Sequence, residues 1–154
     1  MALMLIIIWY VIIGVLAAAG TMYLTYRYVP VRFESVCYGL GLIPVASMYL
    51  AFTAYFDAGA AWPQETAAVV AFVVLGLVGT QRPMALIAGY VLHGGWDFLH
   101  ELQAHAGIDV FAGRASTPIP LAYGAFCLTY DFAVAGYFIV RSRAWATARA
   151  ATAG

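Results

Sequence analysis

Long apolar stretches, separated by short polar segments, make up most of this sequence. A membrane helix needs about 20 predominantly apolar residues to cross the hydrocarbon layer. Five stretches meet this requirement or come close to it, and they cover residues 2–26, 34–56, 63–80, 83–104 and 120–140. Five of the six prolines lie at or near the start of a stretch, where a helix loses little by lacking an N–H. The pattern predicts a single all-α domain, a polytopic membrane bundle of about five helices, followed by a short tail over residues 142–154.

The composition agrees with a membrane protein. Of the 154 residues, 65% are hydrophobic and only 9% are charged, with a mean hydropathy of +0.89. A soluble domain carries about 25% charged residues and leaves about a third of its surface exposed, which is more than this chain can cover with polar groups. The composition excludes a soluble globular domain, a disordered chain and a nucleic-acid-binding protein.

The charged residues are unevenly placed. There is no lysine, and seven arginines balance seven acids. Six arginines fall on one side of the membrane if the N-terminus is outside and the C-terminus is cytoplasmic: Arg27, Arg32, Arg82, Arg141, Arg143 and Arg149. The positive-inside rule therefore predicts this orientation. It places Glu65 at the outer side, and Glu34 at the inner side as a solvated acid near a helix start.

The fourth stretch contains the densest group of ionisable residues. At 100° per residue, His93, Asp97 and His100 fall within about 60° of one another on one helix face. Glu101 and Trp96 flank this face. Ionisable groups at membrane depth are costly, so they normally face the bundle interior and find partners there.

The fifth stretch supplies such partners. Asp131 lies near its middle, and Cys127 precedes it by one turn. A short loop joins the two stretches, so we expect antiparallel neighbours in which Asp97 and His93 reach Asp131 at a similar depth. No arginine lies at this depth, so the acids have three ways to be stabilised: protonation of one carboxyl, pairing with a histidine, or a bound metal ion or cationic ligand. A polar clamp that only fixes helix register is the structural alternative.

Metal binding is one interpretation of this cluster. The predicted ligands come from the following set: His93, Asp97, His100, Cys127 and Asp131. Oxygen and imidazole ligands suit Zn, Fe or Mn. All three helical residues cannot easily share one ion, because positions i and i+7 are about 10.5 Å apart along the axis. Bis-histidine haem ligation within one chain is disfavoured, since every histidine lies on or just after the fourth stretch.

Acid–base chemistry without a metal is the other interpretation. Two carboxyl groups in an apolar cavity can take different protonation states, so that one serves as acid and the other as base. The predicted catalytic residues are Asp97, Asp131, His93, His100 and Glu101. Aromatic side chains can line such a cavity and stabilise a cationic intermediate; the candidates are Trp96, Tyr90, Tyr130 and Tyr123.

These residues resemble the motifs of a family of small bacterial integral-membrane proteins that contain a domain of unknown function. That family has His-x-x-Trp-Asp-x-x-His-His, followed after a proline-containing loop by Cys-x-x-Cys-Asp. Here the matching positions are His93, Trp96, Asp97, His100, Cys127 and Asp131, within about residues 90–131. Glu101 replaces the second histidine and Tyr130 the second cysteine, which weakens a thiol-rich or histidine-rich site. The resemblance implies a related fold, the same His/Asp cluster and a bacterial cytoplasmic membrane, but no known activity.

Three functions follow from these observations. The first is an intramembrane enzyme that acts on a lipophilic, lipid-like or isoprenoid-like small molecule. The second is a non-catalytic subunit or ligand-binding module of a homo-oligomer or larger membrane complex. The third is a proton or metal-ion conduit, although nothing continues the polar path to the cytoplasmic side.

Overall fold

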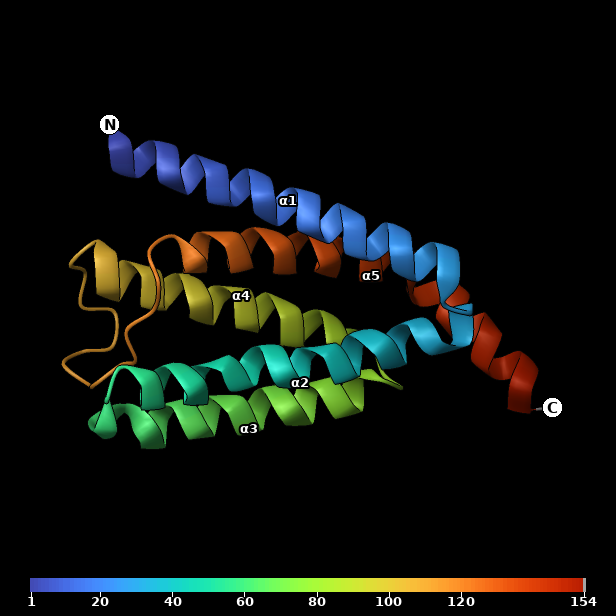
Figure 1. The fold of residues 1–154 in the computed structure, drawn as a ribbon. Helices are drawn as coiled ribbons and strands as arrows, with labels where there is room; N and C mark the ends of the chain where they lie inside the picture. Colours follow the sequence, from blue (N-terminus) through green and yellow to red (C-terminus); the bar gives the residue numbers. More distant parts are fainter. Residues whose placement is uncertain (154) are drawn as a thin grey trace.

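The computed structural model describes residues 1–153, with side chains for residues 1–151. Its helices are α1 (Ala2–Tyr28), α2 (Val31–Tyr55), the short 3-10 helix η1 (Gly59–Ala61), α3 (Trp62–Gly79), α4 (Pro83–His105) and α5 (Tyr123–Ala153) (Figure 1). No strand occurs in this part of the chain. The predicted all-α bundle is confirmed, and the helix starts lie close to the predicted ones.

Four helical segments are long and apolar enough to cross a membrane. They are α1, α2, α5 and the segment Gly59–Gly79, which joins η1 to α3. The fourth predicted span, α4, is not among them, and it is the helix that carries the polar cluster. It packs most extensively against α5 and also contacts α2 and α3, so its polar face is enclosed by the bundle.

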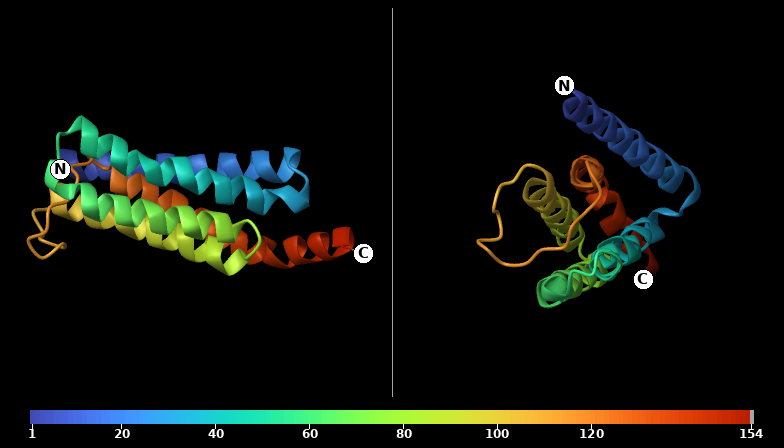
Figure 2. Two further views of the ribbon diagram at one scale, coloured as in Figure 1. Left: turned by 90° about the horizontal axis from the view of Figure 1, so that it is seen from below. Right: turned by 60° about the vertical axis from the view of Figure 1, so that its left-hand side comes forward.

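The helices form two adjacent pairs with α1 at the side. α4 lies beside α5, and α2 lies beside α3 (Figure 1). α1 packs mainly along α5 and diverges from the other helices toward its N-terminus (Figure 2). Most apolar side chains of α1 are exposed, as expected for a helix whose surroundings are lipid.

Glycines allow the closest helix contacts. A Cβ at Gly39 of α2 would lie 2.5 Å from the carbonyl oxygen of Gly76 in α3. In α4, a Cβ at Gly94 would lie 3.0 Å from the Asp131 Cβ of α5. Small residues are the common means of close helix approach in membranes. The contact at Gly94 brings α5 against the polar face of α4.

The predicted solvated position of Glu34 is wrong. Glu34 is fully buried and forms an ion pair with Arg141, whose Nε donates to it over 3.0 Å. Trp145 Nε1 and the Tyr137 hydroxyl also donate to Glu34, over 2.8 and 3.2 Å. The reason is that α5 continues past the predicted end of the last span, which places Arg141 and Trp145 beside the start of α2. The predicted tail is therefore a continuation of α5 up to Ala153, while Gly154 lies outside the described residues.

Candidate functional site

A buried cluster of one histidine and two aspartates lies between α4 and α5. His93, Asp97 and Asp131 are each at most 1% exposed. The His93 Nδ1 atom lies 2.8 Å from Asp131 Oδ2 and 3.1 Å from Asp97 Oδ2. One potential ligand atom from each residue falls within 4.8 Å of the other two. The predicted meeting of the fourth and fifth stretches at this depth is thus confirmed.

Local helix geometry and one glycine create the cluster. His93 and Asp97 are four residues apart, so they point from the same face of α4. Gly94 has no side chain between α4 and the Asp131 carboxylate, whose Oδ2 would lie 3.3 Å from a Cβ at this position. The absence of that side chain lets Asp131 reach the imidazole.

A tyrosine from α2 completes the surroundings of Asp97. The Tyr49 hydroxyl, on a side chain that is 1% exposed, donates a hydrogen bond to Asp97 Oδ1. The other oxygen, Asp97 Oδ2, has no hydrogen-bond partner among the residues that the structure describes, and neither does His93 Nε2. The His93 Nδ1 atom carries at most one hydrogen, which can serve only one of the two carboxylates. The cluster therefore has more acceptors than donors.

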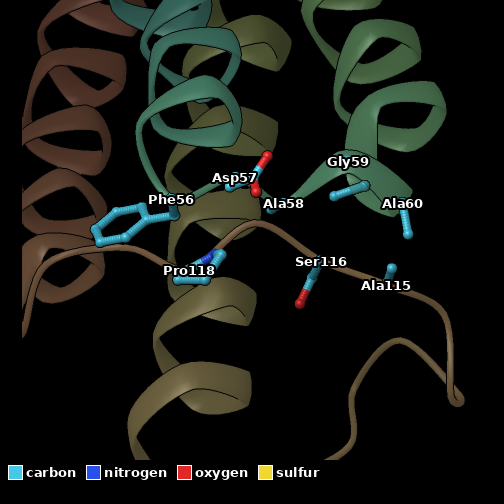
Figure 3. Close-up of a pocket in the computed structure, with 9 residues that line it drawn as sticks. Phe56, Asp57, Ala58, Gly59, Ala60, Ala115, Ser116 and Pro118 are labelled. Atoms are coloured by element: carbon cyan, nitrogen blue, oxygen red, sulfur yellow. The ribbon is translucent and has the colours of Figure 1, made fainter.

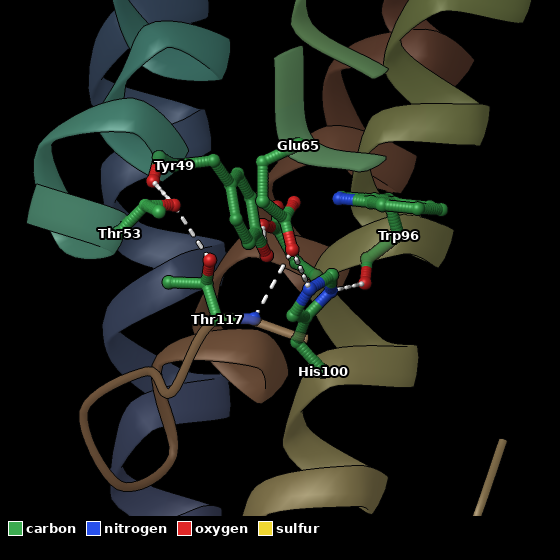
Figure 4. A network of polar contacts seen from close by, with 7 residues as sticks. Tyr49, Thr53, Glu65, Trp96, His100 and Thr117 are labelled. Atoms are coloured by element: carbon green, nitrogen blue, oxygen red, sulfur yellow. Dashed lines mark hydrogen bonds and ion pairs between the residues drawn. The ribbon is translucent and has the colours of Figure 1, made fainter. Parts of the chain in front are cut away.

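His100 belongs to a second network nearer the end of the bundle, which is connected to the cluster through Tyr49, because the Tyr49 carbonyl oxygen accepts from the Thr53 hydroxyl over 2.7 Å (Figure 4). Its Nε2 lies 2.9 Å from Glu65 Oε1, and its Nδ1 lies 3.0 Å from the Trp96 carbonyl oxygen. A carbonyl only accepts, so Nδ1 donates, and the proton between Nε2 and Glu65 makes the pair either an imidazolium with a carboxylate or an imidazole with a carboxylic acid. Both states are neutral overall. The predicted metal-ligand and catalytic role of His100 therefore has to compete with this pairing.

The loop between α4 and α5 closes over this second network. Thr117 donates its backbone N–H to Glu65 Oε1 over 3.1 Å, and its hydroxyl lies 2.6 Å from that of Thr53 (Figure 4). Phe111 packs its ring against those of Trp96 and His100. Glu65 was expected only as an outer acid, so its participation was missed. It is fully buried, because the loop folds back over the first turn of α3.

The hydrogen bonds of Glu101 indicate a structural role at the start of α5. Its Oε1 and Oε2 atoms accept hydrogen bonds from the backbone N–H groups of Ala122 and Gly124, over 2.8 and 3.0 Å. These are otherwise unpaired donors at the start of α5, which a carboxylate stabilises well. Both oxygens of Glu101 are thus engaged in holding α5 against α4, away from the His93 imidazole.

A cavity of about 280 Å³ lies beside the cluster, between α2 and α5. Its lining residues are Val45, Met48, Tyr123, Phe126, Cys127, Tyr130 and Asp131. Val45 and Met48 are about 40% exposed, so the cavity opens at the side of the bundle. Two predicted lining residues, Tyr90 and Trp96, are not part of it. The Tyr90 hydroxyl donates instead to the Tyr38 carbonyl oxygen.

Cys127 lies close to the cluster without being part of its tightest group. The thiol neighbours Asp97 and Tyr123 and is 4% exposed. It does not belong to the described residues whose ligand atoms fall within 4.8 Å of one another. The predicted five-residue ligand set is therefore divided: His93, Asp97 and Asp131 are together, Cys127 is adjacent, and His100 is paired elsewhere.

A second pocket, of about 350 Å³, lies at the end of the bundle where the α4–α5 loop meets the end of α2 and η1 (Figure 3). Asp57 is its only ionisable lining residue, and none of the cluster residues reaches it. It therefore has no evident connection with the buried cluster.

Comparisons of the chain with protein-family models, curated proteins and solved structures found no match. The resemblance of the two polar motifs to a family of bacterial membrane proteins stays a prediction, and a functional assignment depends on the geometry of the cluster.

Proposed function

We propose that this protein is an intramembrane enzyme that acts on a lipophilic small molecule through His93, Asp97 and Asp131. One observation carries the proposal: Asp131 belongs both to the buried cluster and to the wall of the cavity that opens at the side of the bundle. A substrate in this cavity would lie against Asp131, whose carboxylate is in contact with the His93 imidazole. A polar clamp that only fixes helix register has no need for such an opening.

The cavity wall indicates the substrate class. Apart from Asp131, the Cys127 thiol and two tyrosine hydroxyls, its side chains are apolar. The opening lies along α2 between Val45 and Met48, within a helix that is apolar enough to cross a membrane. Ligand sites of this kind bind apolar bodies and orient them with a few polar groups. At about 280 Å³, the cavity accommodates one segment of a lipid or isoprenoid rather than a whole molecule.

The cluster supplies groups suited to proton transfer. Asp131 is the acid of the cluster that lines the cavity, so it removes or delivers the proton in this proposal. His93 connects the two acids and can take up charge as Asp131 changes its protonation state. Asp97, held by Tyr49, is a positioning residue behind the imidazole. Two carboxylates in unequal surroundings are a common way to keep an acid and a base in one site.

The proposed location is the cytoplasmic membrane of a bacterium, with the N-terminus outside and the C-terminus in the cytoplasm. The arginine distribution supports this orientation. Reporter fusions after Tyr28 and at the C-terminus test it: a reporter active only in the cytoplasm is expected to work at both positions. Activity of that reporter after residue 57 would contradict the orientation.

The enzymatic proposal is tested with the purified full-length chain and a lipid extract from its host membrane. Products are followed by mass spectrometry for wild type, Asp131→Asn and the control Asp57→Asn. Asp57 is an exposed acid outside the cluster with a positive φ of 50°, which asparagine tolerates. We expect wild type and Asp57→Asn to change the same lipid species, and Asp131→Asn to change none. A lipid profile that is unaltered by wild type, or altered equally by Asp131→Asn, would overturn the proposal.

A further inference from the structure

We propose that the cluster binds one divalent transition-metal ion, with His93 Nδ1, Asp97 Oδ2 and Asp131 Oδ2 as its protein ligands. The catalytic meaning of this ion rests on the proposed function, because it supplies a cofactor to the same site. Three observations support the ion: the spacing of the ligand atoms, the charge of the cluster and an unpaired carboxylate oxygen.

The spacing fits a shared ion. Metal–ligand bonds to imidazole nitrogen and carboxylate oxygen are about 2.0–2.2 Å long, which puts neighbouring ligand atoms about 3–3.5 Å apart. In the cluster, the His93 nitrogen lies 2.8 and 3.1 Å from the two aspartate oxygens. All three potential ligand atoms lie within 4.8 Å of one another, so side-chain adjustment can bring them around one ion.

The charge of the cluster calls for a cation. The Glu65–His100 pair contains one acid and one imidazole, and it is neutral with the single proton it shares. The cluster around His93 contains two acids for one imidazole. A divalent ion with two carboxylates and a neutral imidazole has no net charge, which removes most of the cost of burying the acids. The ion pairs of Asp97 and Asp131 among the described residues contain no arginine, and Arg141 pairs with Glu34 at the other end of the bundle.

The orientation of Asp97 points to a missing partner. Tyr49 fixes one carboxylate oxygen by a hydrogen bond, so the other, Oδ2, is aimed toward His93 and Asp131. This oxygen is buried and has no hydrogen-bond partner among the described residues; its polar surroundings are His93 Nδ1, 3.1 Å away, and the neighbouring Cys127 thiol. Metal ligands are commonly held in this way, with one oxygen bound to the ion and the other to an orienting donor. Tyr49 would therefore orient a ligand rather than act on the substrate.

The ligand set selects the class of ion. One imidazole and two carboxylates suit Mn²⁺, Fe²⁺ or Zn²⁺, and three protein ligands leave at least one coordination position free. The cavity reaches the cluster at Asp131, so the free position is open to a water molecule or a substrate oxygen. An ion there acts as a Lewis acid or activates water.

The test uses the purified full-length chain in detergent, stripped with a chelator and reloaded separately with Mn²⁺, Fe²⁺ under anaerobic conditions, or Zn²⁺. Bound metal per chain and thermal unfolding are measured for wild type, Asp97→Asn, Asp131→Asn and the exposed control Asp57→Asn. We expect one ion per chain in wild type and the control, with a higher unfolding temperature than in the stripped protein. Each cluster variant should bind more than about 100-fold more weakly, because even orienting residues are worth 10–100-fold.

The comparison of stripped and reloaded wild type does not depend on whether a variant folds. Wild type that binds none of the three ions, with no change in unfolding temperature, overturns the metal site. So does equal binding by wild type and folded Asp131→Asn. The two proposals can fail independently. Lipid turnover that needs Asp131 but survives chelation would support the enzymatic proposal and overturn the metal site. A tightly bound ion without lipid turnover would support the metal site and overturn the enzymatic proposal.

Discussion

Two adjacent glycines in α4 allow a matched test of the contact on which the cluster depends. A Cβ added at Gly94 would lie 3.0 Å from the Asp131 Cβ and 3.2 Å from the Leu128 Cα. A Cβ added at Gly95 would meet nothing within 4 Å. The substitutions Gly94→Ala and Gly95→Ala therefore add the same methyl group to the same helix, one against α5 and the other into open space.

The expected difference in stability between the two variants can be worked out because they share the same change in helix propensity. Replacing a helical glycine by alanine gains about 1 kcal/mol in helix propensity, and this gain cancels between them. At Gly94 the new methyl group forces its neighbours back by a few tenths of an ångström, and one of them is the backbone of Leu128. Overpacking of this kind costs about 1–3 kcal/mol. Gly94→Ala should thus be less stable than Gly95→Ala by about 1–3 kcal/mol, and the displaced Asp131 should lose its 2.8 Å contact with His93.

The assay is reversible unfolding in detergent, followed by tryptophan fluorescence, for wild type and both variants. Gly95→Ala is expected to equal or exceed wild type in stability, and Gly94→Ala to fall below it. Metal binding measured in parallel should be weaker for Gly94→Ala alone. Equal stabilities within about 0.5 kcal/mol, the usual range of a neutral substitution, would refute the close α4–α5 contact.

Three further outcomes follow from the structure. Arg141→Gln should destabilise the protein by about 3–5 kcal/mol because it removes the cation that faces the buried Glu34 carboxylate and leaves only the neutral donors of Trp145 and Tyr137. Adding Glu34→Gln should restore part of this loss in the same unfolding assay, and a double variant less stable than the single would contradict the pairing. Tyr49→Phe should weaken metal binding about 10–100-fold while the exposed control Tyr55→Phe leaves it unchanged, as measured by metal titration. Glu101→Ala should cost about 0.5–2 kcal/mol of unfolding free energy through loss of both cap hydrogen bonds, and an unchanged stability would argue against the capping role.

Predicting the central cluster from the sequence was possible because its geometry is largely local. The four-residue separation of His93 and Asp97 fixes their common helix face. A single connecting loop makes α4 and α5 antiparallel neighbours, so the distance of Asp131 from the start of α5 sets its depth. Helix length and apolar content are also properties of each segment alone, which explains why the helices were predicted well.

The buried partners that the sequence did not predict lie on helices whose neighbours in the bundle cannot be inferred from the residues next to them in the chain. Tyr49 is one of many aromatic residues in an apolar stretch, and nothing in the sequence tells which helix faces Asp97. Glu65 stands in the first turn of α3, a position typical of solvated acids, but Thr117 and the rest of the loop cover it. Glu34 was misplaced for the same reason, because its partner Arg141 is 107 residues away in the chain.

The acidic residues of this chain differ in how their charge is compensated. Five of the seven are buried, and three of these have a partner for their charge within the fold: Arg141 for Glu34, His100 for Glu65 and the N-terminus of α5 for Glu101. Asp97 and Asp131 share a single imidazole instead. Folding alone gives no reason to bury two carboxylates where one histidine must serve both, since apolar residues of similar size cost less there. Of these two acids, Asp131 also lines the lateral cavity, so the shared imidazole and the access route coincide at Asp131, where the proposed cation and substrate would meet.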